Sequence, residues 1–234
     1  MAIAGIVAGG SGSRMGSAKP KQFIELCGRP VIIHTVGAFL KNPLINHVII
    51  GINPEWYDYT KELLQNYGMT QVKLTKGGSD RNETLLNIIR CAKEELSCAD
   101  DEIILTHDAV RPFVSEKMIS DSIEALQKYR IVTAAIPATD TIIISADGEE
   151  ASDFPVRSTV YQVQTPQSFR LGDFTGVLSQ ASRQERQTVT DACKLFHLRG
   201  YAVGLVEGDR RNIKITYPSD MTIAQAICET EEKQ

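Results

Sequence analysis

The stretch that decides the fold is Ile3-Ala4-Gly5-Ile6-Val7-Ala8-Gly9-Gly10-Ser11-Gly12-Ser13-Arg14-Met15-Gly16, followed by Lys19-Pro20-Lys21. Its first six residues are a continuous apolar run that ends in glycines, which is typical of a buried strand. Similar apolar runs follow at 47–52, 103–105, 131–136 and 202–206, and helical patterns lie between them. Strands that alternate with helices predict an α/β fold, with a mostly parallel sheet covered by helices on both faces.

The clearest helical pattern begins after residue 80. Apolar residues recur at helical spacing along one face, at Leu85, Ile88, Ile89, Ala92 and Leu96. Asp80 and Glu83 precede them with the spacing of an N-cap residue and its capping-box partner. Further helices are expected around 56–64, 118–126 and 221–228.

One region, at about 139–167, interrupts this alternation. Two β-rich runs, at 141–144 and 160–164, flank the turn signal Asp147-Gly148 and predict a hairpin that leaves the main sheet. A two-stranded arm is marginally stable alone, so we expect it to pack on a second copy and form a homodimer. An arm folded back on its own subunit is the alternative.

Composition restricts the partners and the compartment. The 234 residues are 42% hydrophobic, enough for one substantial core, and the net charge is −4. This mildly acidic balance offers no broad positive field for nucleic acid or an anionic membrane. No apolar run approaches the ~20 residues that cross a bilayer. The five cysteines are odd in number and lack metal-binding spacing, which favours reduced thiols in a cytoplasmic protein.

The glycine-rich segment after the first strand is the strongest local signal for a ligand site. It does not match the dinucleotide fingerprint, because the Gly required at position 15 is Met15, and it lacks the Gly-Lys-Ser/Thr of a P-loop. What remains is a loop whose backbone N–H groups can approach an anion, with Arg14 and Lys21 able to clamp phosphate oxygens. An ordinary glycine turn with a solvated basic flank is the alternative.

Two later clusters also follow strands. Thr106-His107-Asp108-Ala109-Val110-Arg111-Pro112 places an Asp at the end of a central strand, where it can hold a divalent cation beside phosphates, with Arg111 near a second anion. Alternatively, Asp108 caps the helix that begins near Ser115, and His107 is a core histidine. The third cluster, residues 207–216, contains Lys214, which alternates with Ile213 and Ile215 and so faces away from them.

Six ordered segments together resemble one family over nearly the whole chain. The sequence is similar to the cytidylyltransferases that act on 2-C-methyl-D-erythritol 4-phosphate and to their relatives that act on ribitol 5-phosphate. The segments that carry the resemblance are Ala8 to Met15 with Pro20-Lys21-Gln22, Gly77 to Arg81, His107 to Pro112, Thr139 to Ile142, Gln164 to Gln167, and Asn212-Ile213-Lys214.

The resemblance implies a Rossmann-like nucleotidyltransferase domain over residues 1–234, with CTP and a polyol phosphate as substrates and Mg²⁺ as the cofactor. The implied catalytic residues are Arg14, Lys21 and Lys214. The implied nucleotide-binding residues are Ala8, Gly9, Gly10, Ser11, Gly12, Gly78, Asp80, Arg81 and Thr84. The implied substrate-binding residues are Asp108 (also the Mg²⁺ ligand), Arg111, Arg157, Thr165 and Asp209. Arg157, from the arm, would complete the site of the neighbouring subunit.

The choice of polyol rests on small differences between the two branches. Gly9, Val110 and the segments 78–84 and 190–194 look like the ribitol branch, whereas the short loop between Gly16 and Pro20 and the segment 207–212 look like the methylerythritol branch. We therefore expect ribitol 5-phosphate, to be converted to CDP-ribitol, with methylerythritol phosphate as the alternative. A nucleotide-binding protein without turnover and a nicotinamide oxidoreductase are more remote.

Overall fold

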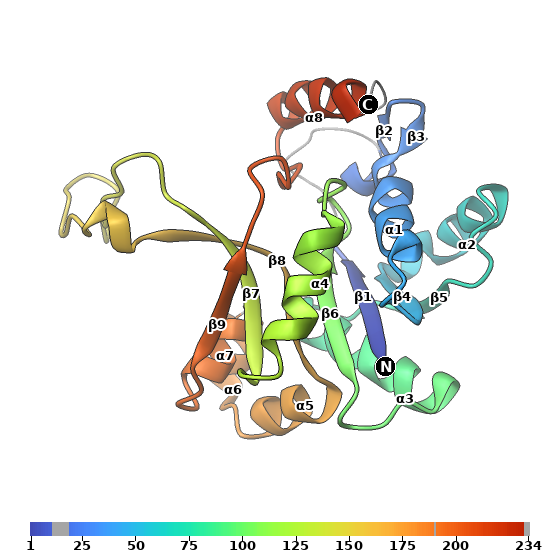
Figure 1. Ribbon diagram of the computed structural model, residues 1–234, viewed down its shortest axis with the longest axis horizontal. Helices are drawn as coiled ribbons and strands as arrows, with labels where there is room; N and C mark the ends of the chain where they lie inside the picture. Colours follow the sequence, from blue (N-terminus) through green and yellow to red (C-terminus); the bar gives the residue numbers. More distant parts are fainter. Residues whose placement is uncertain (11–18, 190, 232–234) are drawn as a thin grey trace.

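The computed structural model describes residues 1–10, 19–189 and 191–231. Its centre is a seven-stranded sheet in the order β5-β4-β1-β6-β8-β7-β9 (Figure 1). The strands of this sheet are β1 (Ala2–Ala8), β4 (His47–Ile52), β5 (Lys73–Lys76), β6 (Ile103–Asp108), β7 (Ile131–Pro137), β8 (Tyr161–Arg170) and β9 (Val203–Glu207). All neighbouring pairs are parallel except those that β8 makes with β6 and β7, so β8 alone runs against the others. The predicted mostly parallel sheet is confirmed.

Helices cover both faces of this sheet. On one face lie α1 (Val31–Lys41), α2 (Tyr57–Asn66) and α4 (Glu116–Ala125), and on the other lie α3 (Arg81–Leu96), α5 (Leu171–Ser179) and α7 (Ala192–His197). A short helix, α6 (Arg183–Thr188), joins α5 to α7. The strand β1 divides its side chains between the two cores, because Ile6 packs with the first group and Ile3 with the second.

A third core supports the end of the chain. The last helix, α8 (Pro218–Glu231), packs over the small hairpin β2 (Glu25–Leu26) and β3 (Arg29–Pro30). Leu26, Phe113, Ile215 and Ala224 form this cluster. In the part of the chain that the structure describes, no helix is long and apolar enough to cross a membrane.

The predicted arm differs from its expected form. The run 160–164, expected as an arm strand, belongs from Tyr161 onward to β8, whose residues Gln164 to Phe169 are buried in the main sheet between β6 and β7. The segment between β7 and β8 does leave the sheet (Figure 1), but within it only an isolated bridge joins Ile144 to Asp153. The 3-10 turn η4 (Arg157–Thr159) leads back into β8.

Candidate active site

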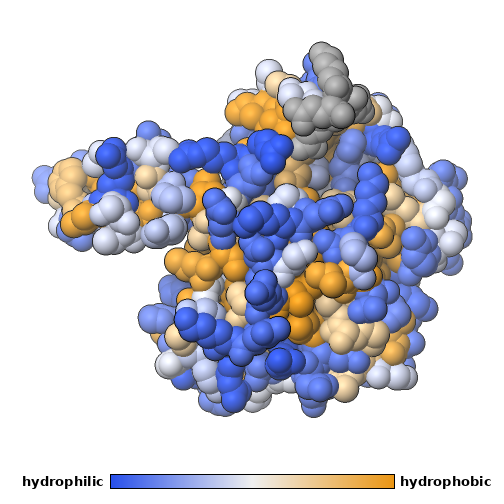
Figure 2. Space-filling model, in the orientation of Figure 1, coloured by the Kyte–Doolittle hydropathy of each residue, from blue (hydrophilic) through white to orange (hydrophobic). Residues whose placement is uncertain are grey.

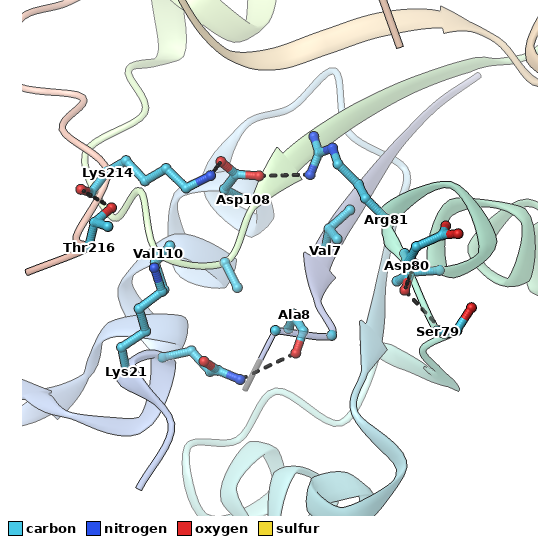
Figure 3. A pocket seen from close by; sticks show the side chains of 16 residues that line it. Val7, Ala8, Lys21, Ser79, Asp80, Arg81, Asp108, Val110, Lys214 and Thr216 are labelled. Atoms are coloured by element: carbon cyan, nitrogen blue, oxygen red, sulfur yellow. Dashed lines mark hydrogen bonds and ion pairs between the residues drawn. The ribbon is translucent and has the colours of Figure 1, made fainter. Parts of the chain in front are cut away.

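The candidate site is a cavity of about 360 Å³ where several strands end. Its lining residues come from the end of β1, the turn η2 (Lys21–Phe23), the start of α3, the end of β6 and the segment before α8. The residues are Val7, Ala8, Gly9, Gly10, Lys21, Gln22, Gly78, Ser79, Asp80, Arg81, Thr84, Asp108, Ala109, Val110, Lys214 and Thr216. Figure 3 shows side chains from these separate segments around one space. Parallel strands place such a ligand site at their carboxyl ends.

Asp108 lies at the centre of the charged side of the cavity. One of its carboxylate oxygens accepts from Arg81 Nη1 at 2.8 Å, and the other lies 2.8 Å from Lys214 Nζ (Figure 3). Arg111 Nε lies 3.6 Å from the second oxygen. Burial alone would raise the pKa of Asp108, but Arg81, Lys214 and Arg111 outweigh it and hold the pKa well below its usual range. Asp108 is therefore an ionised carboxylate at neutral pH.

The start of α3 forms the opposite wall. Asp80 caps the helix by accepting from Glu83 N at 2.8 Å, as predicted. The Glu83 carboxylate does not complete the expected capping box, because it accepts from Ser79 N and Ser79 Oγ, both at 2.7 Å. The positive end of this helix therefore faces the cavity beside Arg81, which suits an anionic ligand.

Thr84 lines the cavity and also supports the turn beside it. Its hydroxyl donates to Asp80 O at 2.8 Å and accepts from Gly78 N at 3.0 Å. A Cβ added at Gly51 would come within 2.6 Å of the Thr84 methyl, and one added at Gly78 would overlap the Glu83 side chain. Thr84 thus fixes the backbone of the Gly78 turn, and its nucleotide-binding role stays a prediction.

Lys21 reaches the cavity from a turn that is anchored on both sides. Gln22 is buried and donates to Ala8 O at 3.2 Å, and Phe23 packs against the rings of Trp56 and Tyr59. Ser11, Gly12 and Arg14, which we also expect at the site, lie outside the described residues.

The structure separates the remaining predicted residues from the cavity wall. Arg111 is buried behind Asp108 and donates to Asn212 O at 2.8 Å, and its expected place near a second anion stays a prediction. Thr165 accepts from Asp108 N at 3.2 Å. The Asp209 carboxylate accepts from Arg211 N at 2.8 Å, and Arg157 lies on the protruding segment, 3.5 Å from Thr139 O. None of these four is among the described residues that line the cavity.

Some residues to which the sequence assigned no role also line the cavity: Val7, Gln22, Ser79, Ala109, Val110 and Thr216. Away from the cavity, Ser115, not Asp108, caps α4 by accepting from Met118 N at 3.2 Å. His107 is fully buried, and its burial lowers its pKa to about 4. Its burial agrees with the alternative of a core histidine that the sequence offered.

Mg²⁺ fits this site if one carboxylate of the protein and the phosphates of a substrate bind it together. No group of three His, Cys, Asp or Glu side chains that could cage a metal occurs within residues 1–10, 19–189 and 191–231. Mg²⁺ commonly uses one carboxylate together with substrate phosphates, and the ionised Asp108 offers that carboxylate in a cavity suited to phosphates. The donor set therefore fits a cation that arrives with a nucleotide.

Comparison with known proteins gives a consistent result. The family model for 2-C-methyl-D-erythritol 4-phosphate cytidylyltransferase (IspD) matches residues 2–230. A 4-diphosphocytidyl-2C-methyl-D-erythritol synthase from Anaerococcus prevotii DSM 20548 is 30% identical with a TM-score of 0.79, and the match covers 98% of this chain and 96% of that one. The Francisella tularensis 2-C-methyl-D-erythritol 4-phosphate cytidylyltransferase is 25% identical with a TM-score of 0.80, covering 96% and 98%.

These names bear on the expected substrate. They belong to methylerythritol enzymes, so they do not support ribitol 5-phosphate, which we expected from the sequence, and they support the alternative better. They agree with the expectation of an enzyme that uses CTP. The chain belongs to the 2-C-methyl-D-erythritol 4-phosphate cytidylyltransferase family and is a CTP-dependent nucleotidyltransferase.

Proposed function

We propose that this enzyme transfers the cytidylyl group of CTP to 2-C-methyl-D-erythritol 4-phosphate and releases pyrophosphate. The observation that carries the proposal is the Asp108 carboxylate held between Arg81 and Lys214 beside Lys21 in one cavity. Such a cluster can receive the phosphates of two substrates. The choice of methylerythritol phosphate is supported by the family match and by the solved relatives.

The reaction requires no nucleophile from the protein. A phosphate monoester is largely a dianion at neutral pH, because its second pKa lies near ~6. One of its oxygens attacks the α-phosphorus of CTP, and the bond from that phosphorus to the oxygen bridging to the β-phosphorus breaks. Pyrophosphate leaves with that electron pair. The difficulty is to bring two polyanions together, so catalysis depends on positioning and on positive charge.

The residues supply that charge from separate elements. Lys21 and Lys214 are proposed to stabilise the reacting α-phosphate, as is Arg14 by resemblance to the family. Ala8, Gly9 and Gly10, with Gly78, Asp80 and Arg81, border the nucleotide. Asp108, with phosphate oxygens of CTP, would hold Mg²⁺, which when bound would neutralise part of the phosphate charge.

We also propose that the protruding segment pairs with a second copy of the chain. Phe154 and Val156 are 65% and 68% exposed on it, and Figure 2 shows apolar side chains on its surface. Arg157 follows directly and is exposed, away from the cavity of its own subunit. A partner would cover the apolar residues and bring Arg157 to its own site, where it would bind the substrate phosphate.

The test is pyrophosphate release from CTP and Mg²⁺, with methylerythritol phosphate and ribitol 5-phosphate assayed in parallel. Release with methylerythritol phosphate, abolished in Lys214→Met, is the expected result. Release with ribitol phosphate alone would overturn the proposed substrate. CTP binding without release in either assay would contradict the proposed reaction and favour a nucleotide-binding protein.

A further inference from the structure

Four buried residues close a ring of hydrogen bonds behind the cavity. His107 Nδ1 lies 3.0 Å from Thr165 Oγ1, and Asn212 Nδ2 donates to Thr165 O at 2.8 Å. Arg111 Nη1 donates to Asn212 O at 2.8 Å, and Arg111 O lies 3.0 Å from His107 Nε2, which closes the ring. His107 and Asn212 are completely inaccessible to solvent. The ring joins β6, β8 and the segment before α8.

The chemistry of the ring determines where its protons lie. Arg111 O can only accept, so His107 Nε2 must carry the proton that it donates. Among the described residues, the hydrogen bonds of the two ring nitrogens are to this carbonyl and the Thr165 hydroxyl, so a charged ring would be buried with no carboxylate bonded to either nitrogen. The ring is therefore neutral, and Nδ1 accepts from the Thr165 hydroxyl. Thr165 Oγ1 in turn accepts from Asp108 N, so its single proton is already committed.

The ring holds the two chain segments that meet at the cavity. Asp108 lies next to His107, and Arg111 N donates to Asp108 O at 3.1 Å. Lys214 follows Asn212 by two residues, and Ile215 N donates to Val110 O at 3.0 Å. The 2.8 Å contact between Asp108 and Lys214 spans these segments, so its geometry depends on how the ring fixes them.

We propose that His107 is a positioning residue: by closing this ring in its Nε2–H tautomer, it sets the relative placement of Asp108 and Lys214 and aims the Thr165 hydroxyl inward. The effect on turnover rests on the proposed function of those two residues. The tautomer and the ring do not, so they can be tested even if the substrate proves to be different.

The first experiment measures the imidazole ¹⁵N shifts of His107 at neutral pH in the full-length protein. A protonated Nε2 with an unprotonated Nδ1 is expected. The Nδ1–H tautomer, or shifts averaged between the two tautomers, would overturn the proposal without bearing on the substrate.

The second experiment uses variants that restore one link at a time. The amide of His107→Gln can reach the place of Nε2 and that of His107→Asn the place of Nδ1, whereas His107→Phe restores neither. His107→Phe is expected to lower kcat by about tenfold or more with the KM for CTP changed by less than about threefold, since the nucleotide wall is outside the ring. The kcat values of His107→Gln and His107→Asn are expected to lie between those of His107→Phe and the wild type. Wild-type kcat in all folded variants would contradict the proposal.

A third comparison separates positioning from direct binding. Thr165→Val should lower kcat and combine non-additively with His107→Phe, whereas Thr165→Ser should be close to wild type. Thr106→Val is the matched control, because Thr106 is also fully buried on β6 and donates to Gln167 O at 2.9 Å, outside the ring. If Thr165→Val raised only the KM for the polyol phosphate, Thr165 would be a ligand and the proposal would fail. Equal losses in Thr106→Val would also overturn it. If His107→Phe does not fold, the kcat values of His107→Gln, His107→Asn and Thr165→Val still test the proposal.

Discussion

The Gln22 amide donates to the carbonyl of Ala8, fourteen residues earlier, and thereby ties the turn that carries Lys21 to the end of β1. The bond is buried, since the Gln22 side chain is 2% exposed. Ala8 is the last residue of β1, where the chain leaves the sheet for the glycine-rich segment. Gln22 and the aromatic contacts of Phe23 therefore hold Lys21 at the cavity.

Gln22→Met is expected to reduce kcat by about tenfold or more, because it keeps the length of the side chain and removes the donor. An unpaired buried carbonyl costs about 1–3 kcal/mol, so the melting temperature should also fall. The informative measurement is kcat in the Lys21→Ala background, where Gln22→Met should add little. Thr60 lies on α2, and its buried hydroxyl donates to Trp56 O just before the helix. Thr60→Val removes this bond and should lower stability without changing kcat. Additive losses of kcat at positions 21 and 22 would contradict the positioning role.

The sequence predicted the elements whose side chains follow one simple pattern. The apolar runs at 3–8, 47–52 and 131–136 are buried strands, and the cap at Asp80 begins α3. It did not predict β5, a four-residue edge strand with a lysine at each end. Such charges are common on edge strands because they discourage pairing with another chain, and they remove the apolar signal.

The prediction for β8 was wrong for a similar reason, because this strand also lacks an apolar signal. Gln164 and Gln167 are buried in the middle of the sheet, although the sequence predicts an arm over about 139–167 that leaves it. Gln167 is stabilised there by donating to Asp191 Oδ2 at 2.7 Å, a partner 24 residues away. At the site, Lys21 and Asp108 were expected from their positions after strands and Lys214 only from the resemblance to the family, but the ring around His107 depends on tertiary contacts that no spacing reveals.

Asp108→Asn is expected to lower both activity and stability at neutral pH. Without the carboxylate, Arg81, Arg111 and Lys214 would face one another unneutralised, and this partly exposed cluster should cost about 1–3 kcal/mol. Thermal denaturation with and without pyrophosphate checks the cause, because an anion should raise the melting temperature of the variant more than that of the wild type. Asp121→Asn, which removes a partly exposed carboxylate 2.5 Å from the exposed Lys117, should have almost no effect.

The difference in melting temperature between the wild type and Asp108→Asn should depend on pH, and the direction of that dependence can be derived. The neighbouring cations hold the pKa of Asp108 below its usual range, so its stabilising contribution is complete above the unfolded value of about 3.9. It is lost as pH falls from there through the folded value. The melting temperatures of wild type and Asp108→Asn should therefore converge below about pH 4. A constant difference down to pH 2 would mean that the charge of Asp108 is not what stabilises the fold.

The thiols should react in two distinct classes. Burial raises the pKa of Cys91 and Cys193 to about 12 and that of Cys98 to about 11, and Cys228 is also buried. Cys27 is half-buried in a tight turn. A thiol reagent at pH 8 should thus modify one cysteine rapidly in the folded protein and all five in guanidinium. Cys27→Ser should abolish the rapid phase; a rapid phase of two or more thiols would contradict the burial.

Replacing the apolar residues of the protruding segment should dissociate the proposed dimer. Phe154→Ser with Val156→Ser removes two of its most exposed apolar side chains, and the mass in solution, measured by light scattering, should halve. Leu198→Ser with Ile223→Ser is the matched control, because these residues are 47% and 52% exposed on other parts of the surface. Equal loss of the dimer in both double variants, or none in the first, would contradict an interface at this segment.

Mixing two inactive variants tests whether Arg157 acts on the neighbouring subunit. Each chain of Arg157→Ala retains Lys214, and each chain of Lys214→Met retains Arg157. In a mixed dimer, the site that contains the intact Lys214 receives the intact Arg157 from its partner, whereas the other site lacks both. Random pairing on co-expression makes half of the dimers mixed, so about one quarter of all sites, and of wild-type activity, should return. If Arg157 served its own subunit, each site in the mixed dimer would lack one residue and no activity would return.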